Sequence, residues 1–342
     1  MNPSTITDIE TAKKLSANFE ALWLGEPIEK LAESLGGLTA EAYSWRGSRP
    51  FYEQSSLEAL STNVIGPMRR AFAGLERREF VKIAGENNAD GAPGVWTCSL
   101  GILTGAFVSD WLGLKPTHRL VQIRYSEFHE VMDGRITQTA FFIDLADVLQ
   151  QLGLDPFPNQ LGARHIFPVP LKGLRASGQR GVEQGAKTMA LLNRMIEDLD
   201  LLNKSGNDTC TPEYLARCWR EDMGWYGPAG IGAMKTIELY QAQHQYPFRQ
   251  GLKNKQYHGH VARFADGDFA AFFGWPNLTN SPRGGYLGLP ESEQRGEMRV
   301  VDVYRRDGDR LAENWVIIDL PHYFMDFGVD LIADAIAKQQ AS

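Results

Sequence analysis

Residues 124–155 read RYSEFHEVMDGRITQTAFFIDLADVLQQLGLD, and residues 299–330 read RVVDVYRRDGDRLAENWVIIDLPHYFMDFGVD. The two segments align without a gap at a constant offset of 175 positions, which is 299 minus 124. Each has the pattern of a strand, a tight turn, a second strand ending in Ile-Asp-Leu, and a short amphipathic segment closed by Gly. Solenoid and propeller repeats are much shorter, so a repeat of this length predicts a duplicated domain.

Both halves of the chain place helical patterns before strand patterns. In the first half the helical patterns are DIETAKKLSANFEALW, PIEKLAESLGG and QSSLEALSTNVIGPMRRAF, and strand alternation follows from REFVKIAGE to RITQTAFFI. In the second half the helical patterns are AKTMALLNRMIEDLDLL, TPEYLARCWREDM and AMKTIELYQAQHQYPF, and strands follow from HGHVARF to RLAENWVIID. Helices segregated to one side of a meander of strands predict an α+β fold, here two fused domains, each an antiparallel sheet with N-terminal helices packed over it.

The boundary between the two domains is set by a change in composition. Residues 156–185 contain four prolines and five glycines without sustained periodicity, which is typical of a linker. Their Phe, Ile, Leu and Val side chains indicate that this linker packs on a surface. We therefore expect a first domain at 1–155, a linker at 156–185 and a second domain at 186–342.

Composition excludes several classes of protein. The chain has 342 residues, 43% hydrophobic and 23% charged, and its formal net charge of −7 comes without a block of Lys and Arg, which argues against nucleic-acid binding. No apolar run reaches the roughly 20 residues that span a bilayer, and the N-terminus lacks the pattern of a secretory signal, so we expect a cytoplasmic protein with no membrane partner. Three cysteines at irregular spacing predict neither a disulfide framework nor a zinc site.

The paired strands of each hairpin predict which side chains share a face, because successive strand residues point to opposite sides. In the second hairpin, the face expected to mix aromatic with ionisable groups holds Asp302, Tyr304, Glu313, Trp315, Ile317 and Asp319. In the first, the matching set is Glu127, His129, Gln138, Ala140, Phe142 and Asp144. Each set stays on one face even if the pairing of the hairpin is misjudged by two residues.

The chain resembles the SnoaL-like polyketide cyclases, within the nuclear transport factor 2-like fold. The resemblance lies in GAFVSDWLGLKPTHR and MDGRITQTAFFIDLADVLQQLG of the first half, and in DMGWYGPAGIGAMKTIELYQAQHQYPFRQGL, ADGDFAAFFGW and ENWVIIDLPHYFMDFG of the second. It covers about two thirds of the chain. It implies two cone-shaped domains, each a curved antiparallel sheet whose wide end is closed by helices over an apolar pocket.

The resemblance also implies a chemistry, which is an intramolecular aldol reaction on an apolar, carbonyl-rich small molecule without metal or organic cofactor. The acid/base group it implies is Asp319 and, in the first half, Asp144, the two residues of the Ile-Asp-Leu motifs. Trp315 matches the family's tryptophan, whereas the first half has Ala140 there, so we expect the second half to be the active one. The resemblance further implies that the two halves pack as a pseudo-dimer, and a homodimer of the whole chain is compatible with it.

Each of these expectations has an alternative. Asp319 and Asp144 directly precede short helical patterns, where Asp is a favoured N-cap, and caps are far commoner than catalytic carboxylates. Tyr304 with Glu313, and His129 with Gln138, could orient a substrate or could simply cover a sheet face. The aromatic residues expected to bind substrate can equally be core residues; they are Phe272, Trp275, Trp225 and Tyr226. A hydrolase or isomerase on the same pocket, and a non-catalytic small-molecule-binding protein, also fit the sequence.

Overall fold

The computed structural model describes residues 3–89, 94–173 and 178–341. Contacts between residues divide the chain into two units. The first unit comprises residues 1–87, 91–156 and 330–342, and the second comprises 88–90 and 157–329. The segment 156–185, expected to be a linker, falls in the second unit from Phe157 onward, and the C-terminal residues 330–342 group with the first unit.

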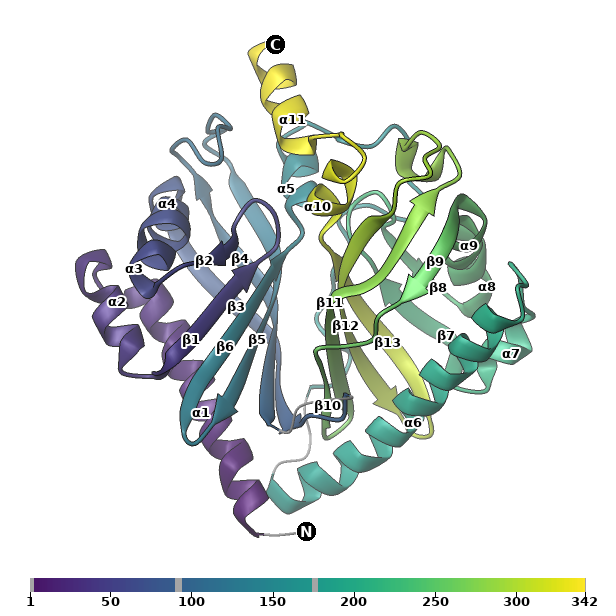
Figure 1. Ribbon diagram of the computed structural model, residues 1–342, viewed down its shortest axis with the longest axis horizontal. Coiled ribbons are helices and arrows are strands. Elements are labelled where there is room, and N and C mark those ends of the chain that lie inside the picture. The colour runs from purple at the N-terminus through teal and green to yellow at the C-terminus, as the bar shows by residue number, and fades with distance from the viewer. Residues whose placement is uncertain (1–2, 90–93, 174–177, 342) are drawn as a thin grey trace. The chain divides into compact units, whose positions relative to one another are not determined.

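The first unit is an α+β domain built on one six-stranded sheet (Figure 1). Its helices are α1 (Pro3–Gly25), α2 (Ile28–Gly36), α3 (Leu57–Leu60), the π-helix η1 (Ser61–Ile65), α4 (Gly66–Ala71), α5 (Leu145–Gln151) and α11 (Leu331–Gln340). Its strands are β1 (Thr39–Gly47), β2 (Tyr52–Gln54), β3 (Phe72–Glu86), β4 (Val95–Phe107), β5 (Leu120–Met132) and β6 (Arg135–Ile143). They lie in the order β2-β1-β6-β5-β4-β3, and α1 packs on β3 and β4.

The second unit repeats this plan with a seven-stranded sheet. Its helices are α6 (Gly178–Lys204), α7 (Pro212–Ala216), α8 (Ile237–Tyr240), the π-helix η2 (Gln241–Gln245), α9 (Tyr246–Gly251), the 3-10 helix η3 (Tyr286–Gly288) and α10 (Leu320–Met325). Its strands are β7 (Trp219–Tyr226), β8 (Ala233–Lys235), β9 (Leu252–Tyr257), β10 (Ala262–Asp266), β11 (Phe269–Pro282), β12 (Gly296–Asp307) and β13 (Arg310–Ile318). They follow the order β10-β11-β12-β13-β7-β8 with β9 beside β11, and α6 packs on β10 and β11.

The predicted α+β architecture with two duplicated domains is confirmed, but the sheets are mixed. Strand β1 pairs in parallel with β6, and β7 pairs in parallel with β13. The residues of β7 were predicted to be partly the end of a helix, but only Pro212–Ala216 is helical there. The reason lies in tertiary pairing: β7 completes the edge of the sheet beside β13, and this contact overrides local helix propensity.

Each hairpin of the repeat carries a one-residue bulge near its turn. In the second unit Arg306 pairs with Leu311, but the next residue, Arg305, pairs with Glu313, so Ala312 is the extra residue. In the first unit Val131 pairs with Ile136, whereas Glu130 pairs with Gln138, so Thr137 is extra. An extra residue reverses the face of every side chain beyond it on that strand.

Candidate functional site

The bulges correct the predicted face assignments. Asp302 lies opposite Val316, and Tyr304 lies opposite Asn314, so these four side chains share a face. Glu313 and Trp315 were predicted on that face, but they pair with Arg305 and Val303 and therefore lie on the other. In the first unit His129 pairs with Thr139 for the same reason, and Gln138 lies on the opposite face with Glu130.

The two carboxylates of the Ile-Asp-Leu motifs cap helices. Asp319 Oδ1 accepts the His322 backbone N–H at 3.3 Å at the start of α10, and Asp144 Oδ1 accepts the Asp147 N–H at 3.1 Å at the start of α5. The other carboxylate oxygen of Asp144, Oδ2, accepts a hydrogen bond from Arg124 Nη1 at 3.2 Å. Asp319 is not among the described residues that line the cavity reported below for the second unit. The structure therefore shows the capping alternative for both residues, and their catalytic role stays a prediction.

The second unit contains a cavity of about 530 Å³ lined by α6, the α8–η2–α9 segment, strands β9, β11 and β12, and the segment before β10. Seven of its lining residues carry aromatic or imidazole rings, contributed by α8, η2, α9, β9, β11, β12 and the segment before β10. Of the other lining residues, five are aliphatic, from α6, β11 and β12, and six are polar or charged. A ring-rich concave site of this volume is the size that encloses a small organic molecule.

Asp302 is the buried carboxyl group of this cavity, whereas Asp200, its other acidic lining residue, is exposed and pairs with Lys204. It is 9% exposed, and its Oδ1 accepts two hydrogen bonds, from the Tyr304 hydroxyl and from Asn314 Nδ2, each at 3.1 Å. Among the described residues, no Lys or Arg forms an ion pair with it. Burial raises the pKa of Asp302 to about 7, and the bonds from Asn314 and Tyr304 oppose part of this rise. The carboxyl can therefore both take up and release a proton near neutral pH.

The rings around Asp302 are packed against one another. Phe272 lies opposite Asp302 on β11, its ring is 5.6 Å from that of Tyr304, and the His260 ring lies 4.0 Å from Phe272. His244 of η2 stacks on Trp225 at 4.1 Å. Burial lowers the pKa of His244 to about 3 and that of His260 to about 4, so both imidazoles are neutral at pH 7. The two histidines therefore add polar atoms to the cavity without adding charge.

Tyr240 lines the same cavity from the C-terminal end of α8. Its hydroxyl has no hydrogen-bond partner among the described residues. Burial and the charge of the Asp302 carboxyl both raise the pKa of Tyr240, so the group remains a protonated donor near Asp302. Asp302 and Tyr240 thus combine a proton acceptor with a free hydrogen-bond donor.

Other residues predicted to bind substrate divide into two groups. Tyr304 and Phe272 line the cavity. The others lie outside the cavity, and His129 belongs to the charge cluster of the first unit described below. In the second unit, Trp315 is fully buried and donates its indole N–H to the Pro168 carbonyl at 2.9 Å, and Tyr226 packs on its ring. Glu313 pairs with Arg305, the Arg299 guanidinium lies over the Trp275 ring, and the Trp225 ring stacks on His244.

Sequence reasoning missed Tyr240, His244 and Phe248, which all line the cavity. A signal existed, because the three residues are spaced four apart and the segment was predicted to be helical. A stripe of rings on a helix is usually part of the core, so the spacing by itself could not identify a binding surface.

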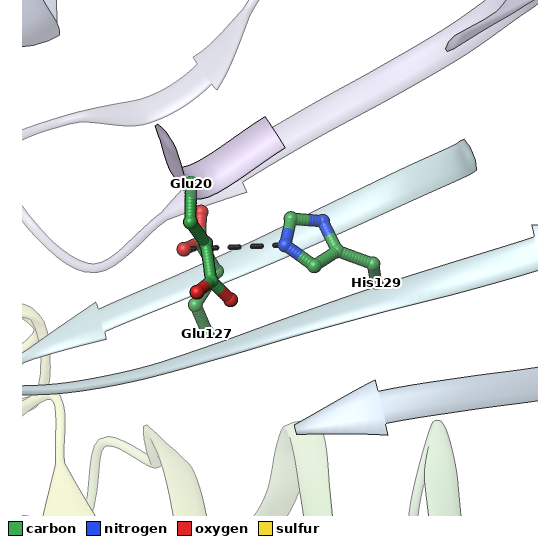
Figure 2. Close-up of side chains that lie close together, drawn as sticks. All are labelled: Glu20, Glu127 and His129. Atoms are coloured by element: carbon green, nitrogen blue, oxygen red, sulfur yellow. Dashed lines mark ion pairs between the residues drawn. The ribbon is translucent and has the colours of Figure 1, made fainter. Parts of the chain in front are cut away.

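The first unit contains a buried cluster of charged residues at the position of the repeat that corresponds to Asp302 in the second unit. Glu20 of α1 and Glu127 and His129 of β5 bring one ligand atom each to within 4.8 Å of one another (Figure 2). His129 Nε2 lies 3.9 Å from Glu127 Oε2, and its Nδ1 lies 2.9 Å from Thr139 Oγ1. Burial lowers the pKa of His129, so its ring is neutral at pH 7.

These three residues do not fit a metal ion, because side-chain cations already neutralise the carboxylates. Arg77 Nη2 lies 2.5 Å from Glu127 Oε2, and Lys82 Nζ lies 2.7 Å from Glu20 Oε2. Burial tends to raise the pKa of Glu20, but Arg77 and Lys82 outweigh it and hold this pKa at about 2. A divalent cation would have to enter beside two fixed positive charges, which Coulomb repulsion disfavours.

The two sites occupy equivalent positions of the repeat. At the offset of 175, Glu127 corresponds to Asp302, His129 to Tyr304 and Thr139 to Asn314. Segments α4 and α9 end at residues 71 and 251, an offset of 180, so Arg77 corresponds to Tyr257, which lines the cavity. The second unit thus keeps a carboxyl at the same place but has a tyrosine where the first has its arginine.

No protein-family model and no curated protein matches the chain. Among solved structures, the chain is similar to IdmH from Streptomyces antibioticus, a candidate polyketide cyclase, at 17% identity over 45% of this chain and 99% of that one, with a TM-score of 0.33. It is also similar to a candidate SnoaL-like polyketide cyclase from Jannaschia sp. CCS1, at 14% identity over 42% and 92% of the two chains (TM-score 0.34). A third is TsrD from Streptomyces laurentii, at 19% identity over 41% and 96% (TM-score 0.33).

Proposed function

We propose that the second unit is an acid/base enzyme that acts on a small, ring-containing carbonyl compound, with Asp302 as the acid/base group. The observation that carries this proposal is the cavity-facing carboxyl without a cationic partner, whose pKa burial raises to about 7. A carboxylate in water is a weak base near neutral pH. One whose pKa matches the working pH removes and returns protons far more effectively.

In the proposed reaction, the Asp302 carboxylate removes a proton from the carbon next to a carbonyl, and Tyr240 donates a hydrogen bond to the enolate oxygen that forms. The enolate carbon then attacks a second carbonyl of the same molecule and closes a carbon–carbon bond. Asp302 returns its proton to the new alkoxide. No atom is gained or lost, so the product is an isomer of the substrate, and the resemblance to SnoaL-like cyclases favours this ring-closing outcome.

A double-bond isomerase is the second candidate for this cavity. It uses the same first step, after which Asp302 returns the proton to a different carbon of the conjugated enolate. The observation that favours it is that one carboxyl group with a pKa near 7 serves both proton transfers. A β,γ-unsaturated ketone that moves its double bond into conjugation would identify this activity.

The test of both candidates is proton exchange at carbon, which precedes ring closure and isomerisation alike. We expect the protein to accelerate exchange of the C1 protons of 2-tetralone in deuterated buffer, followed by nuclear magnetic resonance. Asp302→Asn should lower the rate by about 100-fold or more. Asp319→Asn, which keeps the cap, serves as the matched control and should leave the rate unchanged. Full activity of Asp302→Asn would exclude the proposed function.

A further inference from the structure

The charge of the cavity in the second unit is unbalanced around Asp302. The lining residues with formal charges are Asp200, Arg249 and Asp302. Asp302 receives only neutral donors, Tyr304 and Asn314. Buried carboxylates are generally paired with a cation because desolvation of an isolated charge is costly.

Arg249 does not supply that cation, because its guanidinium is directed at the C-terminal end of α6. Its Nη1 donates to Asn203 Oδ1 at 2.6 Å, its Nη2 to the Leu202 carbonyl at 3.2 Å and its Nε to the Asn207 carbonyl at 3.1 Å. The carbonyl end of a helix carries partial negative charge, which balances the guanidinium. In the first unit Arg69, at the offset of 180, likewise donates to the Glu26 carbonyl after α1, so this is a structural contact common to both units.

Aromatic and imidazole rings line the cavity around Asp302. Tyr304, Phe272, Tyr240 and Phe248 line the cavity together with the two neutral histidines. Aromatic rings attract a positive charge through their electron-rich faces, most strongly where water is excluded. A carboxylate without a counter-ion next to several rings is the combination that recognises an ammonium group.

We propose that the cavity of the second unit binds a small aromatic organic cation, with its ammonium group held by the Asp302 carboxylate and the rings of Phe272 and Tyr304. This inference goes beyond the proposed reaction, because it needs Asp302 as a counter-ion and not as an acid or base. The ligand class is a protonated tertiary amine or quaternary ammonium ion attached to a ring. The cavity volume of about 530 Å³ accommodates such a molecule.

The test is a binding series of three unreactive probes that differ in charge: benzyltrimethylammonium, benzyl alcohol and phenylacetate. Titration calorimetry with the full chain should show the cation binding about tenfold or more tightly than the alcohol, and phenylacetate most weakly. Asp302→Asn should remove most of the preference for the cation and change the affinity for benzyl alcohol by less than about twofold. Phe272→Leu should lower the affinity for benzyltrimethylammonium, because it removes an aromatic ring and leaves the Asp302 carboxylate in place.

Asp334→Asn is the matched control, because it removes the same charge from an exposed position on α11. It should leave the series unchanged. Equal binding of cation and alcohol to the wild-type chain would overturn the inference, and so would tightest binding of phenylacetate, which would assign the cavity to anions through Arg249. The wild-type series decides the question even if a variant fails to fold. The two tests are independent. A protein that shows no preference for the cation can still catalyse proton exchange through Asp302, and a protein that does not catalyse exchange can still prefer the cation.

Discussion

Arg77 and Glu127 form a buried ion pair of 2.5 Å in the first unit, at the repeat position where Asp302 of the second unit faces a cavity and has no cationic partner among the described residues. The same sheet position thus carries a neutralised carboxylate in one unit and a titrating carboxyl group in the other. The difference follows from one side chain of the neighbouring segment, Arg77 in place of Tyr257. Under the proposed function the second unit carries the chemistry, and the ion pair of the first unit has a structural role.

Glu127→Gln should destabilise the protein and leave the exchange activity of the second unit unchanged. The substitution removes the carboxylate that balances the buried Arg77 guanidinium, which we expect to cost about 3 kcal/mol in the free energy of unfolding by urea. Glu76→Gln is the control, because Glu76 pairs with Arg78 at the surface, where such a pair contributes under about 1 kcal/mol. If Glu127→Gln abolished exchange at full stability, the first unit would be the active one.

Asp302 should make the protein less stable as the pH rises from about 4 to 7. Its pKa is raised from 3.8 to about 7 on folding, so in this range the folded state binds a proton that the unfolded state has released. Stability therefore falls with increasing pH, by an amount on the order of 4 kcal/mol, and levels off above pH 7. The measurement is the difference in unfolding free energy between the wild type and Asp302→Asn at each pH. A difference that stays constant from pH 4 to 8 would contradict the raised pKa.

Tyr304→Phe should move the pH–rate profile of exchange to higher pH. The Tyr304 hydroxyl stabilises the ionised carboxylate by donating to Asp302 Oδ1, so its removal raises the pKa of Asp302 further. We expect the rising limb of the profile to shift upward by about one pH unit. Tyr257→Phe, which changes another tyrosine of the cavity that does not bond to Asp302, should leave the limb in place.

Tyr240→Phe should lower the rate of exchange without moving its pH profile. If this hydroxyl stabilises the enolate oxygen, its loss lowers kcat by about 100-fold and leaves KM nearly constant. Stability should change by less than about 0.5 kcal/mol, since the hydroxyl has no partner among the residues that the structure describes. An unchanged kcat would remove Tyr240 from the mechanism and leave Asp302 in place.

Asp319→Ala should destabilise the second unit, whereas Asp319→Asn should not. Loss of the N-cap of α10 costs about 1 kcal/mol, and Asn caps about as well as Asp. Asp144→Asn should cost more than Asp319→Asn, because the buried Arg124 lies 3.2 Å from Asp144 Oδ2, whereas Arg299 Nη1 lies 4.0 Å from Asp319 Oδ2. Thermal unfolding of the three variants compares these effects directly.

The fold was largely predictable from sequence because its signals are local and occur twice. Helical periodicity identified α1, α2 and α6, and the Asp-Gly turn and alternating strands identified the two hairpins of the repeat. The parallel strands β1 and β7 were missed, since each is defined by a partner about 90 residues away in the chain, as Trp45 with Thr139 and Trp225 with Asn314 show.

The candidate site was predictable only in part. Tyr304 and Phe272 were identified, and Asp302 was placed on the same face as Tyr304. Ala312 then reversed the second strand, so Glu313 and Trp315 were assigned to the wrong face, and Asn314 to the opposite one. A bulge has no signature in the alternation itself, because both sides of β13 are buried and both carry polar as well as apolar side chains. Within the described part of the chain, Asp302 lacks a cationic partner because Tyr257 stands at the position of Arg77 in the first unit. No local sequence pattern relates Tyr257 to Asp302.

The division of the chain makes the second unit an insertion within the first. Residues 330–342 return to the first unit, where Asp330 pairs with Arg49 at 2.7 Å and Lys338 donates to the Asp155 carbonyl at 2.9 Å. A recombinant fragment that stops at residue 155 would therefore lack its closing helix, whereas one spanning 157–329 keeps the whole cavity. The duplicated halves are not interchangeable modules, because residues 157–329 of the second unit lie between two segments of the first.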